Sequence, residues 1–362
     1  MKIVAIVLIV ISHVVQTLTS ENPYMSYQGY VLDIACATKS IQCFTLVCFR
    51  AFGALGNSLF FVCSAWFLLE SASYRKEKIF SMLCEIWSVS IIVLLITYRL
   101  IPQKMSTTIF IRSLFPTTFS NNWYMTCYMI FYAIHPVLNK IIQEMNQIQL
   151  FRCSIILATM YLVIGSIKQD LFFSSSLILW GTIYFMIAYM KKYMRNFADN
   201  NEVNIILCCM CVLGFVGLNL MTDIGGGYLE FLSDKMLHWS SNCNPFIIGI
   251  AITMFNLARN LSFQNKKVNY ISSLSLLIYV IHENLILRTY FRPLIWIYIF
   301  QNWGYQHVLT WVLVVSCLVF IFGLLCAFTY SFTIKKGMFK PIHCMYDWMR
   351  KKYLVEEKKY IR

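Results

Sequence analysis

Long apolar stretches separated by short polar segments run along most of the chain. A helix needs about 20 mostly apolar residues to cross the hydrocarbon core of a membrane. The pattern therefore predicts an all-α fold, a polytopic bundle of about ten transmembrane helices. The predicted helices cover residues 3–19, 44–69, 79–98, 122–142, 153–168, 174–190, 203–221, 243–259, 270–288 and 305–334.

The composition agrees with a membrane protein, since 59% of the residues are hydrophobic and only 13% are charged. Soluble domains average about 45–50% apolar and about 25% charged residues. No connection exceeds about 25 residues, which leaves no room for a soluble catalytic domain beside the bundle. Most of the 14 cysteines lie in apolar runs, and the pair Cys208 and Cys211 lacks partners for a zinc site. We therefore expect no disulfide framework, no metal site and no bound cofactor.

The distribution of basic residues predicts the orientation of the bundle. With the N-terminus in the cytoplasm, 21 of the 30 lysines and arginines fall on the cytoplasmic side and eight on the outer side. This bias follows the positive-inside rule and places both termini in the cytoplasm. The net charge of +14 is then a signature of the cytoplasmic face, and nucleic acid is excluded as a partner.

The chain divides into a membrane domain, residues 1–334, and a basic tail, residues 335–362. Apolar side chains recur in the tail at helical spacing, as Ile342, Met345, Trp348, Met349 and Tyr353. This spacing predicts either an amphipathic helix on anionic lipid or a partly ordered basic tail. A signal peptide at the other end is disfavoured, because the first apolar run lacks an A-x-A-like cleavage site and contains a histidine.

That histidine, His13, is the first candidate for chemistry. An α-helix turns about 100° per residue, so Lys2 and His13 share one helix face, about 16 Å apart. Ionisable groups inside a membrane usually face a bundle interior or a wet cavity. Two interpretations stay open on this feature alone: a catalytic imidazole, or a histidine that hydrogen-bonds a neighbouring helix.

The second predicted helix, CFRAFGALGNSLFFVCSAWFLLES, adds further polar groups. Arg50 is the hardest to explain by packing, because a guanidinium cannot be neutralised. Gly53 and Gly56 allow the close approach of a neighbouring helix or ligand. Asn57 and Ser64 add small polar side chains to an apolar helix.

Together, K-x10-H in the first helix and R…GALGNSLFFVCSAWF in the second resemble the integral-membrane acyltransferases of the acyltransferase-three family. Two later stretches resemble it as well, NNWYMTCYMIFYAIHPVLNK and SLSLLIYVIHENLILR, the second with Tyr279 and His282. The resemblance covers most of the chain. In two departures, Lys2 stands where the family more often has arginine, and Ala65 where it has glycine.

The resemblance implies an O-acyltransferase that moves an acyl group, most often acetyl, from cytoplasmic acyl-CoA to an envelope carbohydrate or glycolipid. It places the protein in a bacterial plasma or inner membrane, in contact with membrane lipid. His13 is then the catalytic residue, acting as a general base or becoming transiently acylated, with Lys2 as its basic companion and Arg50 as a functional arginine. Three cations at the cytoplasmic side are Arg75, Lys76 and Lys78. They either pair with the phosphates of the donor or belong to a solvated loop.

A catalytic histidine usually has an orienting carboxylate. We expect this partner to be Glu85, two turns into the third helix. The alternative is that Glu85 is a structural acid. Past mid-membrane, His282, Glu283 and Asn284 form either an acceptor-sugar site or an interhelical hydrogen-bond cluster. The candidate substrate-binding residues are therefore Lys2, Arg50, Asn57, Ser64, Arg75, Lys76, Lys78, Tyr279, His282, Glu283 and Asn284.

Two other functions compete with this one. A secondary transporter or flippase for a small solute or lipid-linked sugar also needs ionisable residues in a helical bundle. The sequence lacks the paired interrupted helices in two halves that favour such a transporter. A glycan polymerase commonly has a large outer loop, and no long loop is evident.

Overall fold

The computed structural model describes residues 1–18, 41–102, 105–119, 121–167, 176–226, 238–304, 306–335 and 337. Within these ranges the chain forms helices and turns and contains no β-strand, which confirms the all-α prediction for them. The helical elements are α1 (Lys2–Gln16), α2 (Ile41–Leu68), α3 (Lys76–Leu100), α4 (Thr107–Leu114), α5 (Trp123–Glu144), α6 (Gln147–Ala158), η2 (Thr159–Ile164), α7 (Gly165–Ile167), α8 (Ser176–Tyr193), α9 (Arg195–Asp199), α10 (Asn201–Gly226), η3 (His238–Ser240), α12 (Pro245–Arg259), α13 (Lys266–His282), η4 (Leu287–Phe291), α14 (Arg292–Trp303), α15 (Val308–Tyr330) and η5 (Ser331–Lys335).

A helix overlaps each of the ten predicted stretches, but these helices differ in length and polarity. In the described part of the chain, five are long and apolar enough to cross a membrane, and a bent pair makes up to six. α1 has 15 residues and therefore a length of only about 22 Å. The number of crossings and the side of the termini stay predictions, and the tail beyond residue 337 lies outside the described residues.

The outward faces of several helices are strongly apolar. On α10, Ile206, Met210 and Leu213 are exposed, and on α15 Leu318 and Leu325 are exposed. Such continuous apolar faces are unfavourable in water and match lipid chains. The protein is thus a multi-pass membrane protein with apolar outer faces on several of its helices.

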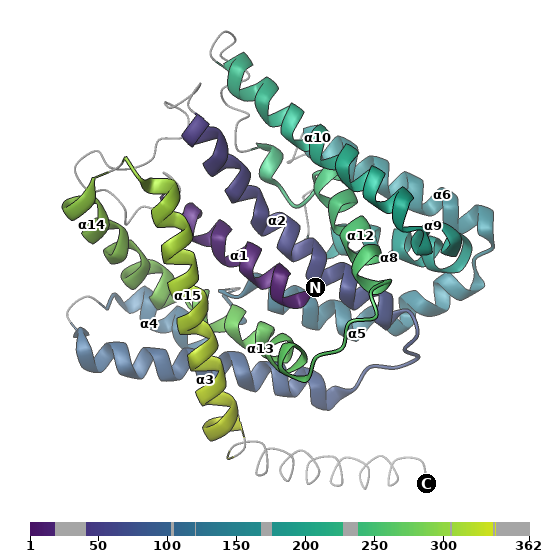
Figure 1. Cartoon of the computed structure of the whole chain (residues 1–362). Coiled ribbons are helices and arrows are strands. Elements are labelled where there is room, and N and C mark those ends of the chain that lie inside the picture. Colours follow the sequence, from purple (N-terminus) through teal and green to yellow (C-terminus); the bar gives the residue numbers. More distant parts are fainter. Residues whose placement is uncertain are drawn as a thin grey trace, which may run out of the picture.

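The short helix α1 lies in the middle of the bundle, with α2 on one side and α13 and α15 on the other (Figure 1). Ala5, Ile6 and Ile9 belong to one buried apolar cluster, and Val10 and Val14 belong to a second. Because helices surround it, Ser12 and His13 of α1 face other side chains, while Lys2 at its start is exposed.

One predicted helix is interrupted in the structure. The pattern over 270–288 predicts a continuous helix, but α13 ends at His282, and the chain bends by 66° before η4 and α14. The side-chain oxygen of Asn284 accepts a hydrogen bond of 3.0 Å from the backbone N–H of Ile286. This contact gives a partner to a backbone N–H group in the first turn after the break. Broken backbone at membrane depth is tolerated where protein surrounds it, and Glu283 and Asn284 are both buried.

Candidate active site

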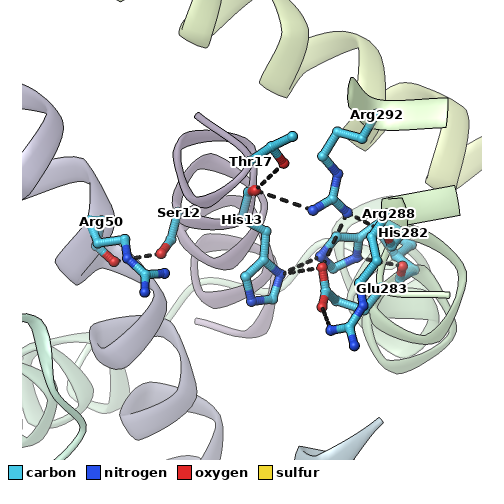
Figure 2. Close-up of polar contacts among 9 residues, drawn as sticks. Ser12, His13, Thr17, Arg50, His282, Glu283, Arg288 and Arg292 are labelled. Atoms are coloured by element: carbon cyan, nitrogen blue, oxygen red, sulfur yellow. Dashed lines mark hydrogen bonds and ion pairs between the residues drawn. The ribbon is translucent and has the colours of Figure 1, made fainter. Parts of the chain in front are cut away.

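Two glycines of α2 let α1 approach closely and fix its rotation. A Cβ atom on Gly53 would lie 2.6 Å from Oγ of Ser12, and one on Gly56 would lie 2.5 Å from the carbonyl oxygen of Ala5. Both distances are far below van der Waals contact, so the close approach expected from the sequence is confirmed. Ser12 also donates a hydrogen bond of 2.5 Å to the carbonyl oxygen of Arg50. With Ser12 directed at α2, the next side chain, His13, points toward α13 (Figure 2).

His13 meets two polar side chains from the end of α13. Its Nδ1 lies 2.9 Å from Oε1 of Glu283 and 3.1 Å from Nε2 of His282. The side chain of Glu283 is only 7% exposed, and that of His13 is 13% exposed. The three side chains therefore form a buried cluster that joins residues 269 positions apart in the chain.

Two arginines hold the carboxylate of this cluster. Nη2 of Arg292 lies 3.1 Å from Oε1 of Glu283, and Nη1 of Arg288 lies 3.3 Å from Oε2. Arg292 also donates to the carbonyl oxygens of His13, at 3.2 Å, and of His282, at 2.5 Å. One buried guanidinium thus ties α1, the end of α13 and Glu283 together, and the carboxylate stays charged without being solvated.

The hydrogen bonds determine which nitrogen of each imidazole carries a proton. Nδ1 of His282 is 2.9 Å from the carbonyl oxygen of Ile278, which can only accept, so this nitrogen donates. In the neutral ring, Nε2 of His282 is then an acceptor. Nδ1 of His13 faces this acceptor and the Glu283 carboxylate, so it donates as well. The remaining nitrogen of His13, Nε2, therefore carries the free lone pair and is the basic atom of the site.

The end of a helix favours a positive charge in this cluster. At the end of α13 the backbone N–H groups of Glu283 and Asn284 donate to the carbonyl oxygens of Tyr279 and Ile281, and the partial negative charge of the helix end lies beside the cluster. The carbonyl oxygen of His282 accepts from Arg292. The break after His282 thus leaves the carbonyl group of His282, which an uninterrupted helix would have used internally, available to Arg292.

The same three side chains carry donor atoms of the kinds that bind metal ions. The donor atoms of His13, His282 and Glu283 all lie within 4.8 Å of one another, and two histidines with a glutamate suit zinc. However, Arg288 and Arg292 already contact the carboxylate, and their two positive charges oppose a dication. The residues fit a hydrogen-bonded imidazole and carboxylate pair better than a metal centre.

A separate pocket of about 260 Å³ opens near the other end of α1. Small-molecule sites are typically about 300–1,000 Å³, so this pocket suits one part of a larger ligand. Its walls combine three lysines, one glutamate, six serines and two tyrosines with apolar side chains. The lining residues are Lys2, Phe60, Ser64, Lys78, Ser81, Met82, Glu85, Tyr124, Tyr128, Ser272, Ser273, Leu274, Ser275, Leu276, Leu277, Ser331 and Lys335.

A row of rings joins the pocket to the cluster. Tyr124 lines the pocket, and its ring centroid lies 5.7 Å from that of Tyr279. The ring of Tyr279 is in turn 5.7 Å from that of His282, which is 5.4 Å from His13. Among the described residues, Tyr279 therefore contacts both the wall of the pocket, at Tyr124, and the cluster, at His282.

The carboxylate beside His13 is that of Glu283, whereas Glu85 contacts a different residue. Glu85 accepts from Nζ of Lys335 at 2.7 Å and lines the pocket. The expected pair of His13 and Glu85 is thus replaced by His13 with Glu283. The reason lies in the break after α13, which turns Glu283 toward α1, a bend that helical periodicity does not reveal.

The other predicted residues divide between the two places. Lys2, Ser64 and Lys78 line the pocket, while Arg75 and Lys76 are exposed and are not among its described lining residues. Nζ of Lys78 also lies over the ring of Tyr132, 4.4 Å from its centroid.

Arg50 and Asn57 lie apart from the cluster. The Arg50 side chain is on the far side of α1 from Glu283 (Figure 2), and its carbonyl group accepts from Ser12. The side-chain amide of Asn57 is 3.4 Å from Oδ1 of Asn242, a contact between α2 and the turn before α12. These two residues support the arrangement of helices around α1.

Arg292 and Lys335 are not among the candidate residues predicted from the sequence. A usable signal existed for Arg292, because Pro293 follows it and proline is common in the first turn of a new helix. That signal indicates a break between Tyr279 and Pro293. No comparable signal marks Lys335, which is one of nine basic residues near the C-terminus.

Comparison with known protein families gives one match. The family model of the acyltransferase domain named acyltransferase 3 matches residues 1–330. Searches of curated proteins and of solved structures found no match.

Proposed function

The chain belongs to the acyltransferase 3 family, and we propose that it transfers an acyl group, most simply acetyl, from cytoplasmic acyl-CoA to a hydroxyl of an envelope carbohydrate. Family membership supports an acyltransferase. The donor, the acetyl group and the carbohydrate acceptor are the proposed part. One observation carries the proposal: Nδ1 of His13 lies 2.9 Å from the buried Glu283 carboxylate, which leaves Nε2 as the base.

In the proposed reaction, Nε2 of His13 removes the proton from the acceptor hydroxyl. The hydroxyl oxygen attacks the carbonyl carbon of the thioester, the carbon–sulfur bond breaks, and the coenzyme A thiolate takes the proton back from His13. Glu283 holds Nδ1–H in place and stabilises the imidazolium that forms between the two proton transfers. Arg288 and Arg292 keep this carboxylate ionised and oriented.

The pocket beside Lys2 is the proposed site for the phosphates of the donor. Three ammonium groups line it, from Lys2, Lys78 and Lys335, and phosphate oxygens are good acceptors for them. A thioester arm attached there would extend past Tyr279 toward His13. This arrangement explains why lysine and histidine occupy opposite ends of one short helix.

A transiently acylated His13 is the second route to the same product. Nε2 would attack the thioester itself, coenzyme A would leave, and the acyl-imidazole would pass its acyl group to the hydroxyl. Incubation of purified protein with acetyl-CoA without acceptor separates the two routes. An intact-mass increase of one acetyl group that requires His13 supports the covalent route.

The decisive experiment replaces His13 with alanine in cells that make the protein, followed by mass spectrometry of the envelope glycans. We expect loss of about 10²- to 10⁴-fold of the acylation, the usual contribution of a general base. His307→Ala is the matched control, because His307 is an exposed histidine at the start of α15. Unchanged glycan acylation in the His13→Ala strain would defeat the proposed function, and a transporter would then be the better interpretation.

A further inference from the structure

Glu85 stands in an unexpected place for a membrane acyltransferase that binds an anionic donor. Among the described residues that line the pocket, it is the one carboxylate, facing three lysines and several serines. The Glu85 side chain is 10% exposed, and that of Lys335 is 45% exposed. Their 2.7 Å ion pair therefore lies at the border between the buried wall and the open part of the pocket.

Lys335 is positioned by two features at the end of α15. Residues Ser331–Lys335 form the π-helical turn η5, and such turns often occur at functional sites. The residue before this turn, Tyr330, shares a hydrogen bond of 2.5 Å with Oγ of Ser88 on α3. Since Ser88 is one helical turn from Glu85, the same two elements are fixed together at two adjacent points.

This pair cannot be explained as support for catalysis. The orienting carboxylate of His13 is Glu283, and Glu85 is committed to Lys335. Nor does a carboxylate help to bind phosphate, because two anions would compete for one ammonium group. Without any anion, however, three ammonium groups around one pocket would repel one another. A glutamate supplies the missing negative charge while the pocket is empty.

We propose that Glu85 is an internal anion that occupies Lys335 in place of a donor phosphate. A phosphate of acyl-CoA displaces the carboxylate when it binds, and the carboxylate returns when coenzyme A leaves. Glu85 thus determines the affinity for the donor and eases release of the product. The inference rests on the proposed function, since it names the residue that sets donor binding at that same pocket.

The test is the affinity of the purified, full-length protein for coenzyme A, measured by calorimetry with wild type and Glu85→Gln. Glutamine keeps the size of the side chain and removes its charge. We expect the variant to bind coenzyme A about three- to tenfold more tightly. The reason is that the partly exposed ion pair of Glu85 with Lys335 no longer competes with the phosphate. The matched control is Glu77→Gln, which removes the same charge from the first turn of α3, outside the pocket lining.

Lys335→Gln is the second variant, and we expect it to weaken binding of coenzyme A by about three- to tenfold. Glu85→Gln should then change the affinity much less in the Lys335→Gln background, because the carboxylate acts through that lysine. Lys140→Gln, at an exposed lysine outside the pocket lining, controls for the loss of one positive charge. S-acetylpantetheine lacks the phosphates, so its KM should not respond to Glu85→Gln.

The outcomes separate this inference from the proposed function. Wild-type protein that binds no coenzyme A would remove the proposed donor and the inference with it. Coenzyme A that binds wild type and Glu85→Gln equally, or the variant more weakly, would overturn the inference alone. The inference would also fail if Glu85→Gln improved the use of S-acetylpantetheine as much as that of acetyl-CoA.

Discussion

Two buried carboxylates of this protein, Glu283 and Glu85, each contact a nitrogen of a basic side chain, but their surroundings differ. Glu283 faces His13 and receives two arginines, one of them as deeply buried as itself. Glu85 faces one lysine, which is 45% exposed and lies on the wall of a pocket. The first carboxylate is held from several sides, whereas the second pairs with a half-exposed lysine, from which, on our proposal, another anion displaces it.

On the proposed function, this difference lets the same kind of side chain serve two purposes within one bundle. A fixed carboxylate orients an imidazole, since a base has to be in position before the substrate arrives. A displaceable carboxylate suits a binding pocket, since the ligand has to enter and leave. α1 connects the two places, with Lys2 at the pocket and His13 at the cluster.

The largest effect should come from Glu283→Gln. Glutamine can still accept from Nδ1 of His13, but it cannot stabilise an imidazolium by charge, and its amide can turn toward the ring. We expect kcat for acyl transfer to fall about 10²- to 10³-fold. Steady-state kinetics of the purified protein with acetyl-CoA measures this. If Glu85→Gln lowers kcat as much as Glu283→Gln does, the division of roles between the two acids is wrong.

A second, smaller effect concerns the packing of α1. A Cβ on Gly56 meets the backbone of Ala5, which can move only with the helix, so Gly56→Ala should cost about 1–3 kcal/mol of stability. Gly53→Ala meets the hydroxyl of Ser12, which can rotate away, and should cost about 1 kcal/mol for the lost hydrogen bond.

Thermal unfolding in detergent measures both changes. Gly181→Ala is the control, because nothing lies within 4 Å of the added methyl group, and a helix usually gains about 0.5–1 kcal/mol from this change. A larger loss for Gly53→Ala than for Gly56→Ala would contradict the close backbone contact at Ala5.

The smallest effect should come from Arg292→Lys, which keeps the charge beside Glu283. An ammonium group cannot reach the carboxylate and both carbonyl groups in the fork geometry of a guanidinium. We expect about a fivefold loss in kcat, with KM for acetyl-CoA unchanged, because the pocket is untouched. A change confined to KM would instead place Arg292 in donor binding.

The sequence predicts candidate residues one helix at a time, and their roles stay predictions, whereas the contacts between them come from the structure. His13 was identified by its depth in an apolar helix, and Gly53 and Gly56 by their spacing in the next one. His282, Glu283 and Asn284 were recognised as a polar group, with an interhelical cluster as one of two interpretations. The contact of His13 with Glu283 could not be read from the sequence, because helical periodicity describes one helix at a time.

The sequence by itself determined the all-helical membrane bundle and the family, because both depend on composition, on the length of apolar stretches and on motifs contiguous in the chain. Only the tertiary structure decided which acid contacts which basic side chain. The break after His282 bends the chain and brings Glu283 to α1, while the turn after Tyr330 brings Lys335 to Glu85. Both pairings are made by residues far apart in the chain, and the energy that selects them arises only when the helices pack.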